Sequence, residues 1–248
     1  MSSRTNDNSE LNTSPADLVS EEELPGQRER ERRRARRAVA ILAAVALVLA
    51  GVAGWRAYEH NKSQPFPVPV RATGDGNGIV ISSGKIKVDV YVDFNCRHCK
   101  DFESSTSGAI DQLLASRTIA LTYHPIAILD QSSNPPGYST QAAAASACAA
   151  DGGKFLDFVK ALFALQPAEN APGLTDDQLV QIGAWVGLID PEFAHCVRHG
   201  DYRRWVGHST DVATDKGVSG TPTLLVAGRT VPNAGADTLL EAVDAAKR

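Results

Sequence analysis

The sequence has few cysteines, no excess of positive charge outside one short segment, and no internal repeat. Its four cysteines form an even set, which suits an oxidising compartment, but the number is too small to establish one. Residues 79–248 contain 14 basic and 19 acidic side chains, so we expect this part not to bind nucleic acid. Hydrophobic residues make up 43% of the chain and charged residues 22%, which are ordinary values for a globular protein. Function must therefore be inferred from local segments.

One stretch lacks charged residues altogether. Residues 38–55 contain only Ala, Val, Ile, Leu, Gly and a final Trp55, and as a helix they would be about 27 Å long. Seven arginines precede the stretch between Arg28 and Arg37, and Tyr58 follows it. These flanks predict a single transmembrane helix in the cell membrane, with a cytoplasmic N-terminus and an extracytoplasmic remainder.

A cleaved secretory signal is the competing interpretation of this stretch. Small residues at Gly51-Val52-Ala53 could be cut by a signal peptidase. The 37 residues before the apolar run and the length of the run favour an uncleaved anchor. Under either interpretation the rest of the chain is exported.

The chain divides into four parts by composition. Residues 1–37 are polar and predict a disordered cytoplasmic tail, and residues 38–55 predict the membrane helix. Residues 56–78 combine a proline-rich and a glycine-rich piece, which is typical of a linker. Residues 79–248 have a suitable size for one domain.

Alternating strands and helices predict an α/β fold for this domain. We expect a hairpin from 79–81 into a central strand at 85–94, a helix at about 95–114 and a parallel strand at 118–124. A helical block follows at about 139–216. Its five expected helices cover residues 140–150, 154–165, 175–186, 191–198 and 202–214. A strand at 223–226, a short return at 230–231 and a helix at 237–246 complete the chain.

Cys96 and Cys99 are separated by two residues at the point where the central strand gives way to a helix. The unpaired N–H groups of a helix start stabilise a thiolate, so this position favours a redox-active pair. A purely structural disulfide is the alternative, but its loop is so short that it would contribute little. Zinc would need about four ligands, and only His98 lies beside the two cysteines.

His195 and His199 are four residues apart on an expected helix, a spacing that suits a metal ion. Such pairs are more often ordinary surface or core residues. We therefore assign no metal site.

Far downstream of the cysteine pair, Gly220-Thr221-Pro222-Thr223 leads into another strand. Together these two features resemble the thioredoxin superfamily, and the helical block resembles its DsbA-like branch of exported thiol–disulfide oxidoreductases. The segment Asp93-Phe94-Asn95-Cys96-Arg97-His98-Cys99 is similar to the Asp-Phe-x-Cys-Pro-x-Cys pattern of that branch. The resemblance implies a thioredoxin-like fold with an inserted helical domain.

The resemblance also implies roles for individual residues. Cys96 would be an exposed nucleophile that forms mixed disulfides, and Cys99 the buried thiol that resolves them. His98 would stabilise the Cys96 thiolate. Pro222 would have a cis peptide bond, and Thr221 would present its backbone to a bound substrate.

Arg97 replaces the proline of the pattern, which adds a positive charge and removes rigidity. Val90 stands six residues before Cys96, where thioredoxin itself carries a buried aspartate. Asp93 lies nearer the site and could accept or relay protons, or could serve at the surface or as a cap.

Cys148 and Cys196 belong to different helices of the block and can form a second disulfide if Cys96 pairs with Cys99. The loop of about 49 residues would contribute about 4 kcal/mol in the chain-entropy model. Some DsbA-like proteins carry such a second bridge, which this pair resembles. The alternative is two unpaired, buried cysteines.

The function implied by these features is a membrane-tethered oxidoreductase that introduces disulfides into unfolded exported proteins. A membrane partner such as a vitamin K epoxide reductase homologue or a DsbB-like protein would reoxidise it. We expect no cofactor and a monomer. A thiol reductase with the same site, or a thioredoxin-like metallochaperone or binding module, remain the alternatives.

Overall fold

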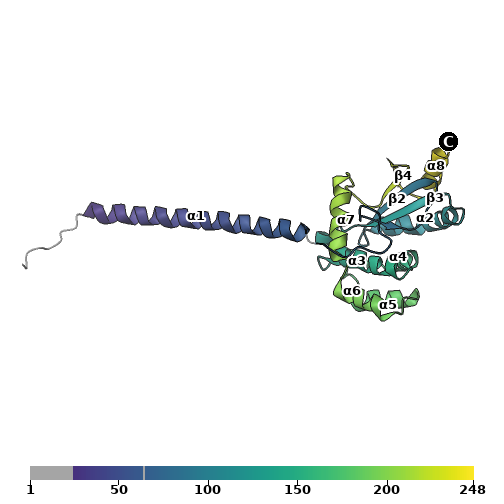
Figure 1. The fold of residues 1–248 in the computed structure, drawn as a ribbon, viewed down its shortest axis with the longest axis horizontal. Helices are drawn as coiled ribbons and strands as arrows, with labels where there is room; N and C mark the ends of the chain where they lie inside the picture. Colours follow the sequence, from purple (N-terminus) through teal and green to yellow (C-terminus); the bar gives the residue numbers. More distant parts are fainter. Residues whose placement is uncertain (1–24, 64) are drawn as a thin grey trace, which may run out of the picture. The chain divides into compact units, whose positions relative to one another are not determined.

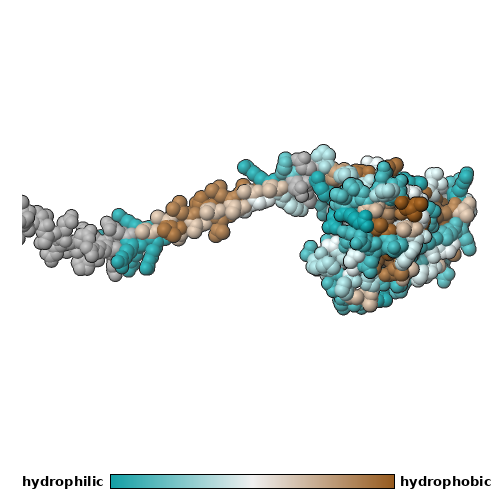
Figure 2. All heavy atoms as spheres, turned by 90° about the horizontal axis from the view of Figure 1, so that it is seen from below, coloured by the Kyte–Doolittle hydropathy of each residue, from teal (hydrophilic) through white to brown (hydrophobic). Residues whose placement is uncertain are grey.

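The computed structural model describes residues 25–63 and 65–248, and the chain separates into two compact units, with the second starting at Pro65. The described part of the first unit is a single helix, α1 (Pro25–Ser63). Its apolar stretch is the brown region in Figure 2, which follows the hydrophilic arginine segment. Within the described residues, α1 is long and apolar enough over Arg32–His60 to cross a membrane.

Helix α1 extends beyond the expected membrane segment at both ends. Residues 25–37 are helical and not disordered, because Arg, Glu and Ala favour helix and Pro25 occupies its first position, where proline is tolerated. Residues 56–63 are also helical, so α1 continues into the first part of the expected linker at 56–78. The rest of the expected tail, residues 1–24, lies outside the described residues.

Residues 65–78 belong to the second unit and are held by it. The Val70 N–H donates to the Asp151 carboxylate at 2.8 Å, and Ala72 forms a β-bridge with Ile79. The carbonyl oxygen of Asn77 lies 2.8 Å from Nδ1 of the buried His124. These polar contacts fix a segment whose composition alone is typical of a free linker.

The second unit is built on a five-stranded sheet with the order β1-β3-β2-β4-β5 (Figure 1). The central strand β2 (Ile86–Val92) pairs in parallel with β3 (Ile119–Pro125), as expected, through the crossover helix α2 (Arg97–Ala115). On its other side β2 pairs antiparallel with β4 (Thr223–Val226), which continues into β5 (Arg229–Thr230).

The expected hairpin between residues 79–81 and the central strand is wrong. Strand β1 (Ile79–Val80) pairs antiparallel with β3, with Val80 opposite Thr122. Both edges of β2 are already occupied by β3 and β4, so the preceding segment can add only to the outer edge of the sheet.

Alternating side chains of β2 serve the two faces of the sheet. Val88, Val90 and Val92 are fully buried in the main core, beside α2 and the closing helix α8 (Ala236–Ala246). Tyr91 points to the opposite face, where it joins a small cluster with Ala213. The sheet is thus covered on both faces, as the thioredoxin-like expectation requires.

The helical block lies between β3 and β4, as predicted, and follows a short 3-10 helix (Asp130–Ser132). Its helices are α3 (Tyr138–Asp151), α4 (Phe155–Ala164), α5 (Asp176–Trp185), α6 (Pro191–His199) and α7 (Arg203–Asp215). Each expected helix of this block is confirmed to within two residues. The block's α3, α4, α5 and α6 lie together to one side of the sheet in Figure 1.

Candidate active site

The cysteine pair lies at the junction of β2 and α2, as its position in the sequence predicts. Cys96 is the N-cap residue of α2, with extended backbone angles (φ −79°, ψ 118°), and its N–H donates to the Asp93 carbonyl at 3.0 Å. Cys99 lies one turn into the helix and is fully buried. Both are free thiols in this structure, which is therefore the reduced form of the pair.

The loop before β4 lies against this turn. Because β4 pairs with β2, with Thr223 opposite Tyr91, the residues before Thr223 lie next to the end of β2. The Cys96 thiol donates to the carbonyl oxygen of Thr221 at 3.2 Å. The Thr221–Pro222 peptide bond is cis, as the resemblance implies.

The two thiols have opposite electrostatic environments. Hydrogen bonds from the Cys99 thiol, the Thr221 side chain and the backbone N–H groups of Cys99 and His98 outweigh burial and lower the pKa of Cys96 to about 6. Burial raises the pKa of Cys99 well above its usual value, and the neighbouring Cys96 adds to this effect. At neutral pH the pair is therefore a Cys96 thiolate beside a Cys99 thiol, and the hydrogen bond from Cys96 to the Thr221 carbonyl belongs to the protonated form.

The expectation that Cys96 is exposed is wrong. Its exposed fraction is 6%, because the Thr221 loop and the turn itself cover the sulfur. Access is through a cleft of about 630 Å³ that Cys96 lines together with Thr221, Gln166 and Glu169. A second hollow of about 620 Å³ lies beside it, lined by His98, Phe102 and Pro222.

His98 and Arg97 are both exposed. The His98 backbone N–H contributes to stabilising the Cys96 thiolate, whereas its imidazole lines the hollow beside Pro222. A role for the imidazole in catalysis stays a prediction.

Asp93 is completely buried, so the surface position considered from the sequence is wrong. Its carboxylate accepts hydrogen bonds from the Asn95 and Leu129 N–H groups, both at 2.9 Å, and from the Ser139 hydroxyl at 2.8 Å. Burial outweighs these bonds and raises the pKa of Asp93 to about 6. The side chain joins the active-site turn to the start of α3.

Gln166 is a site residue that the sequence does not reveal. Its side-chain Nε2 donates to the carbonyl oxygens of Phe94 and Cys96, at 2.9 and 3.0 Å. It lies in the loop after α4, 70 residues from Cys96, and belongs to no motif. Only the three-dimensional fold brings it to the cysteines.

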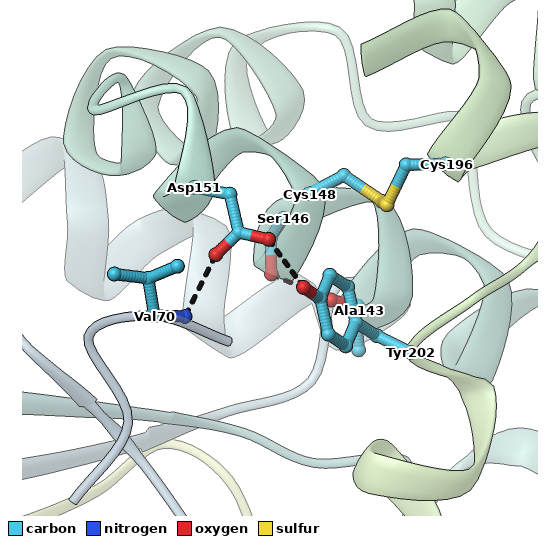
Figure 3. Close-up of a disulfide and its surroundings, with 7 residues drawn as sticks. All are labelled: Val70, Ala143, Ser146, Cys148, Asp151, Cys196 and Tyr202. Carbon is cyan, nitrogen blue, oxygen red and sulfur yellow. Dashed lines mark hydrogen bonds between the residues drawn. A yellow bond between two sulfur atoms is a disulfide. The ribbon is translucent and has the colours of Figure 1, made fainter. Parts of the chain in front are cut away.

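Cys148 and Cys196 form a disulfide between α3 and α6, with their Cα atoms 6.0 Å apart (Figure 3). The alternative of two unpaired cysteines is therefore wrong. Asp151 lies near this bridge and accepts hydrogen bonds from the Val70 N–H and the Tyr202 hydroxyl. The disulfide thus stabilises the end of α3 that holds residues 65–78.

The His195 and His199 rings lie 3.9 Å apart between centroids on α6. Among the described residues, no group of three or more histidine, cysteine or acidic side chains is arranged to hold a metal ion.

Comparison with known proteins gives a family for this site. The Thioredoxin_4 family model, described as thioredoxin, matches residues 81–245, which include both cysteines of the active-site turn and the cis-proline loop.

A curated relative is the serine/threonine-protein kinase PknE of Mycobacterium tuberculosis, which is 32% identical over 158 residues. The match covers 59% of this chain but 28% of the kinase. The chain thus spans less than a third of that relative's length, and the kinase activity is a property of PknE.

Solved structures agree on the fold. The reduced disulfide bond oxidoreductase DsbG of Mycobacterium tuberculosis has 27% identity and a TM-score of 0.61, over 69% of this chain and 88% of that one. Reduced DsbA of the same organism has 26% identity and a TM-score of 0.60, over 68% and 92%. MdbA of Actinomyces oris has 24% identity and a TM-score of 0.61, over 74% and 92%. With its Cys96–Cys99 pair, the chain belongs to the thioredoxin family and is a thiol–disulfide oxidoreductase of the DsbA-like kind.

Proposed function

We propose that this protein is a membrane-anchored oxidase that introduces disulfides into unfolded exported proteins. The observation that supports this direction is the lowered pKa of Cys96, at about 6. A stabilised thiolate favours the reduced form of the pair, so its disulfide is a good oxidant.

The reaction is two thiol–disulfide exchanges. A substrate thiolate attacks the Cys96 sulfur of the oxidised pair, which forms a substrate–Cys96 disulfide and breaks the Cys96–Cys99 bond. Cys99 leaves as a thiolate and takes up a proton at once, since its pKa is raised. A second substrate thiolate then attacks the substrate sulfur of the mixed disulfide, and Cys96 leaves. The substrate loses two electrons and the enzyme pair gains them.

The neighbouring residues have roles consistent with this reaction. Cys96 is the better leaving group in the second step because its thiolate is stabilised. The Thr221 backbone, next to Cys96 and Pro222, would pair with an extended substrate segment. The exposed His98 imidazole would contact the substrate near the mixed disulfide.

The apolar helix α1 would serve as a single-pass anchor with the catalytic unit outside the membrane. The reduced pair must then pass its two electrons to an acceptor. A membrane partner of the vitamin K epoxide reductase or DsbB kind would supply that acceptor.

The direct test is a stoichiometric reaction with a reduced model peptide that carries two cysteines. Oxidised full-length protein in proteoliposomes should convert about one equivalent of dithiol to disulfide, and Cys96→Ser should convert none. A reduced protein that instead opens the peptide disulfide at the same glutathione poise would favour the reductase alternative.

A further inference from the structure

The loop after α4 holds the active-site turn from outside. Gln166 Nε2 donates to the Phe94 and Cys96 carbonyl oxygens, which lie on either side of Asn95. The end of α4 makes a second contact, since Lys100 Nζ in the first turn of α2 donates to the Ala164 carbonyl at 3.3 Å. The helical block is therefore attached to the peptide groups that carry the nucleophile.

Asp93 holds the turn on the strand side, where its carbonyl accepts from the Cys96 N–H at 3.0 Å and its carboxylate from the Asn95 N–H at 2.9 Å. The helix side of the turn has no such anchor of its own, since Cys96 forms no side-chain cap hydrogen bond to α2. The next position, the first residue of α2, is the exposed Arg97, which has no ring to fix its φ angle. A proline at a first helical position would fix φ near −65°, the value that the helix needs.

The orientation of this turn decides how well the thiolate is stabilised. The backbone N–H groups of His98 and Cys99 stabilise the sulfur of Cys96, and they do so only while the first turn of α2 keeps its shape. The Cys96 carbonyl accepts from the Cys99 and Lys100 N–H groups at 3.2 and 3.4 Å. Gln166 binds the same oxygen and so fixes the peptide plane between Cys96 and Arg97.

We propose that Gln166 is a positioning residue that provides, from the helical block, the rigidity which Arg97 does not provide within the turn. Its carboxamide keeps the first amides of α2 directed at the Cys96 sulfur. This deepens the redox function proposed above, because it makes the reactivity of the cysteine pair depend on a loop outside the thioredoxin part of the fold.

Removal of the Gln166 carboxamide should reduce both the stabilisation of the Cys96 thiolate and the oxidising power of the Cys96–Cys99 disulfide. Thiolate absorbance at about 240 nm measures the pKa of Cys96. In full-length protein, Gln166→Ala should raise this pKa by about 0.5 to 1 unit. That corresponds to about a three- to tenfold loss of thiolate stabilisation. The equilibrium constant for oxidation of glutathione should fall by a similar factor.

A proline at position 97 should restore the rigidity of the turn, and with it the stabilisation of the Cys96 thiolate, that Gln166→Ala removes. The backbone of Cys96 already has the extended angles that a residue before proline prefers, and the N–H of a first helical residue has no partner within the helix. We expect Arg97→Pro in the Gln166→Ala protein to return two constants to within about twofold of the parent. These are the acid dissociation constant of the Cys96 thiol and the equilibrium constant with glutathione. Arg97→Ala in the same background removes the charge equally but adds no rigidity, and should not restore them.

Two further variants keep the test decisive. The smaller alanine could act by destabilising the fold. Gln166→Met preserves the side-chain volume without the donors, so it should reproduce the Gln166→Ala shift in the pKa of Cys96 if the donors are what matters. Gln181→Ala removes an exposed glutamine from α5 and should change neither value.

The proposal is overturned if Gln166→Ala and Gln166→Met both leave the pKa of Cys96 within about 0.2 unit of the parent. It is also overturned if Arg97→Pro and Arg97→Ala restore it equally. The thiolate titration does not depend on the direction of electron flow, so these results are independent of whether the oxidase function holds.

Discussion

The thiol of Cys96 lies 3.2 Å from the carbonyl oxygen of Thr221, although 125 residues separate them in the chain. This contact joins the two motifs of the sequence into one site. It also places the nucleophile beside the cis peptide bond of Pro222.

The two cysteines should behave differently when each is replaced. Cys96→Ser should abolish oxidation of a reduced substrate, because the protein can no longer form the Cys96–Cys99 disulfide that the substrate thiolate attacks. Cys99→Ser should also oxidise no dithiol, but with a disulfide-bonded substrate its Cys96 thiolate should form a mixed disulfide that accumulates, since no Cys99 thiol is present to release it. Non-reducing gels after acid quenching would show these adducts, and equal trapping by both variants would contradict the assigned roles.

The stability of the reduced form should rise with pH between about 6 and 9. In this window the native Cys96 is a thiolate, whereas an unfolded cysteine, with its ordinary pKa of 9.0, still holds its proton. The stabilisation is therefore fully present above pH 9 and is lost as pH falls through about 6. Urea unfolding of the reduced protein and of Cys96→Ser would test this. The difference between them should increase with pH by at most about 1.4 kcal/mol per unit, and a constant difference would refute it.

The disulfide between Cys148 and Cys196 should act on stability and not on chemistry. Replacing both with serine removes a cross-link that spans 48 residues, which should lower the free energy of unfolding by about 4 kcal/mol. Urea unfolding measures this loss, and the glutathione equilibrium of the Cys96–Cys99 pair should stay within about twofold of the parent. A loss below about 1 kcal/mol would show that the bridge contributes little.

Asp93 should be essential to the structure of the turn. Asp93→Asn turns an acceptor toward three donors into a group that also carries N–H, so we expect a loss of about 1 to 3 kcal/mol in the free energy of unfolding. Asp101→Asn, on the exposed face of α2, is the matched control and should change it by no more than about 0.5 kcal/mol. Similar effects of the two substitutions would argue against this role.

Much of the fold follows from local pattern. The five helices of the block and the parallel pair of β2 and β3 show clear periodicity and end signals, so the sequence predicts them closely. The pairing of β1 with β3 depends on which edge of the sheet is free, which no local segment contains. Residues 65–78 look like a linker because their partners, such as Asp151 and His124, are far away in sequence.

The site shows the same division. Cys96, Cys99, Thr221 and Pro222 belong to motifs that can be recognised in the sequence. Gln166 could not be found, because a glutamine in a loop carries no pattern until the fold places it against the Cys96 carbonyl. The burial of Cys96 was likewise hidden, because it results from the packing of a distant loop.

The reduction potential of the Cys96–Cys99 pair tests the central claim most directly. Full-length protein would be equilibrated with defined ratios of reduced and oxidised glutathione, and the thiol content measured after acid quenching. A Cys96 pKa of about 6, against about 7 in thioredoxin, predicts a potential about 30 mV above the thioredoxin value of about −270 mV. A value at or below about −270 mV would contradict the oxidase function and favour a reductase.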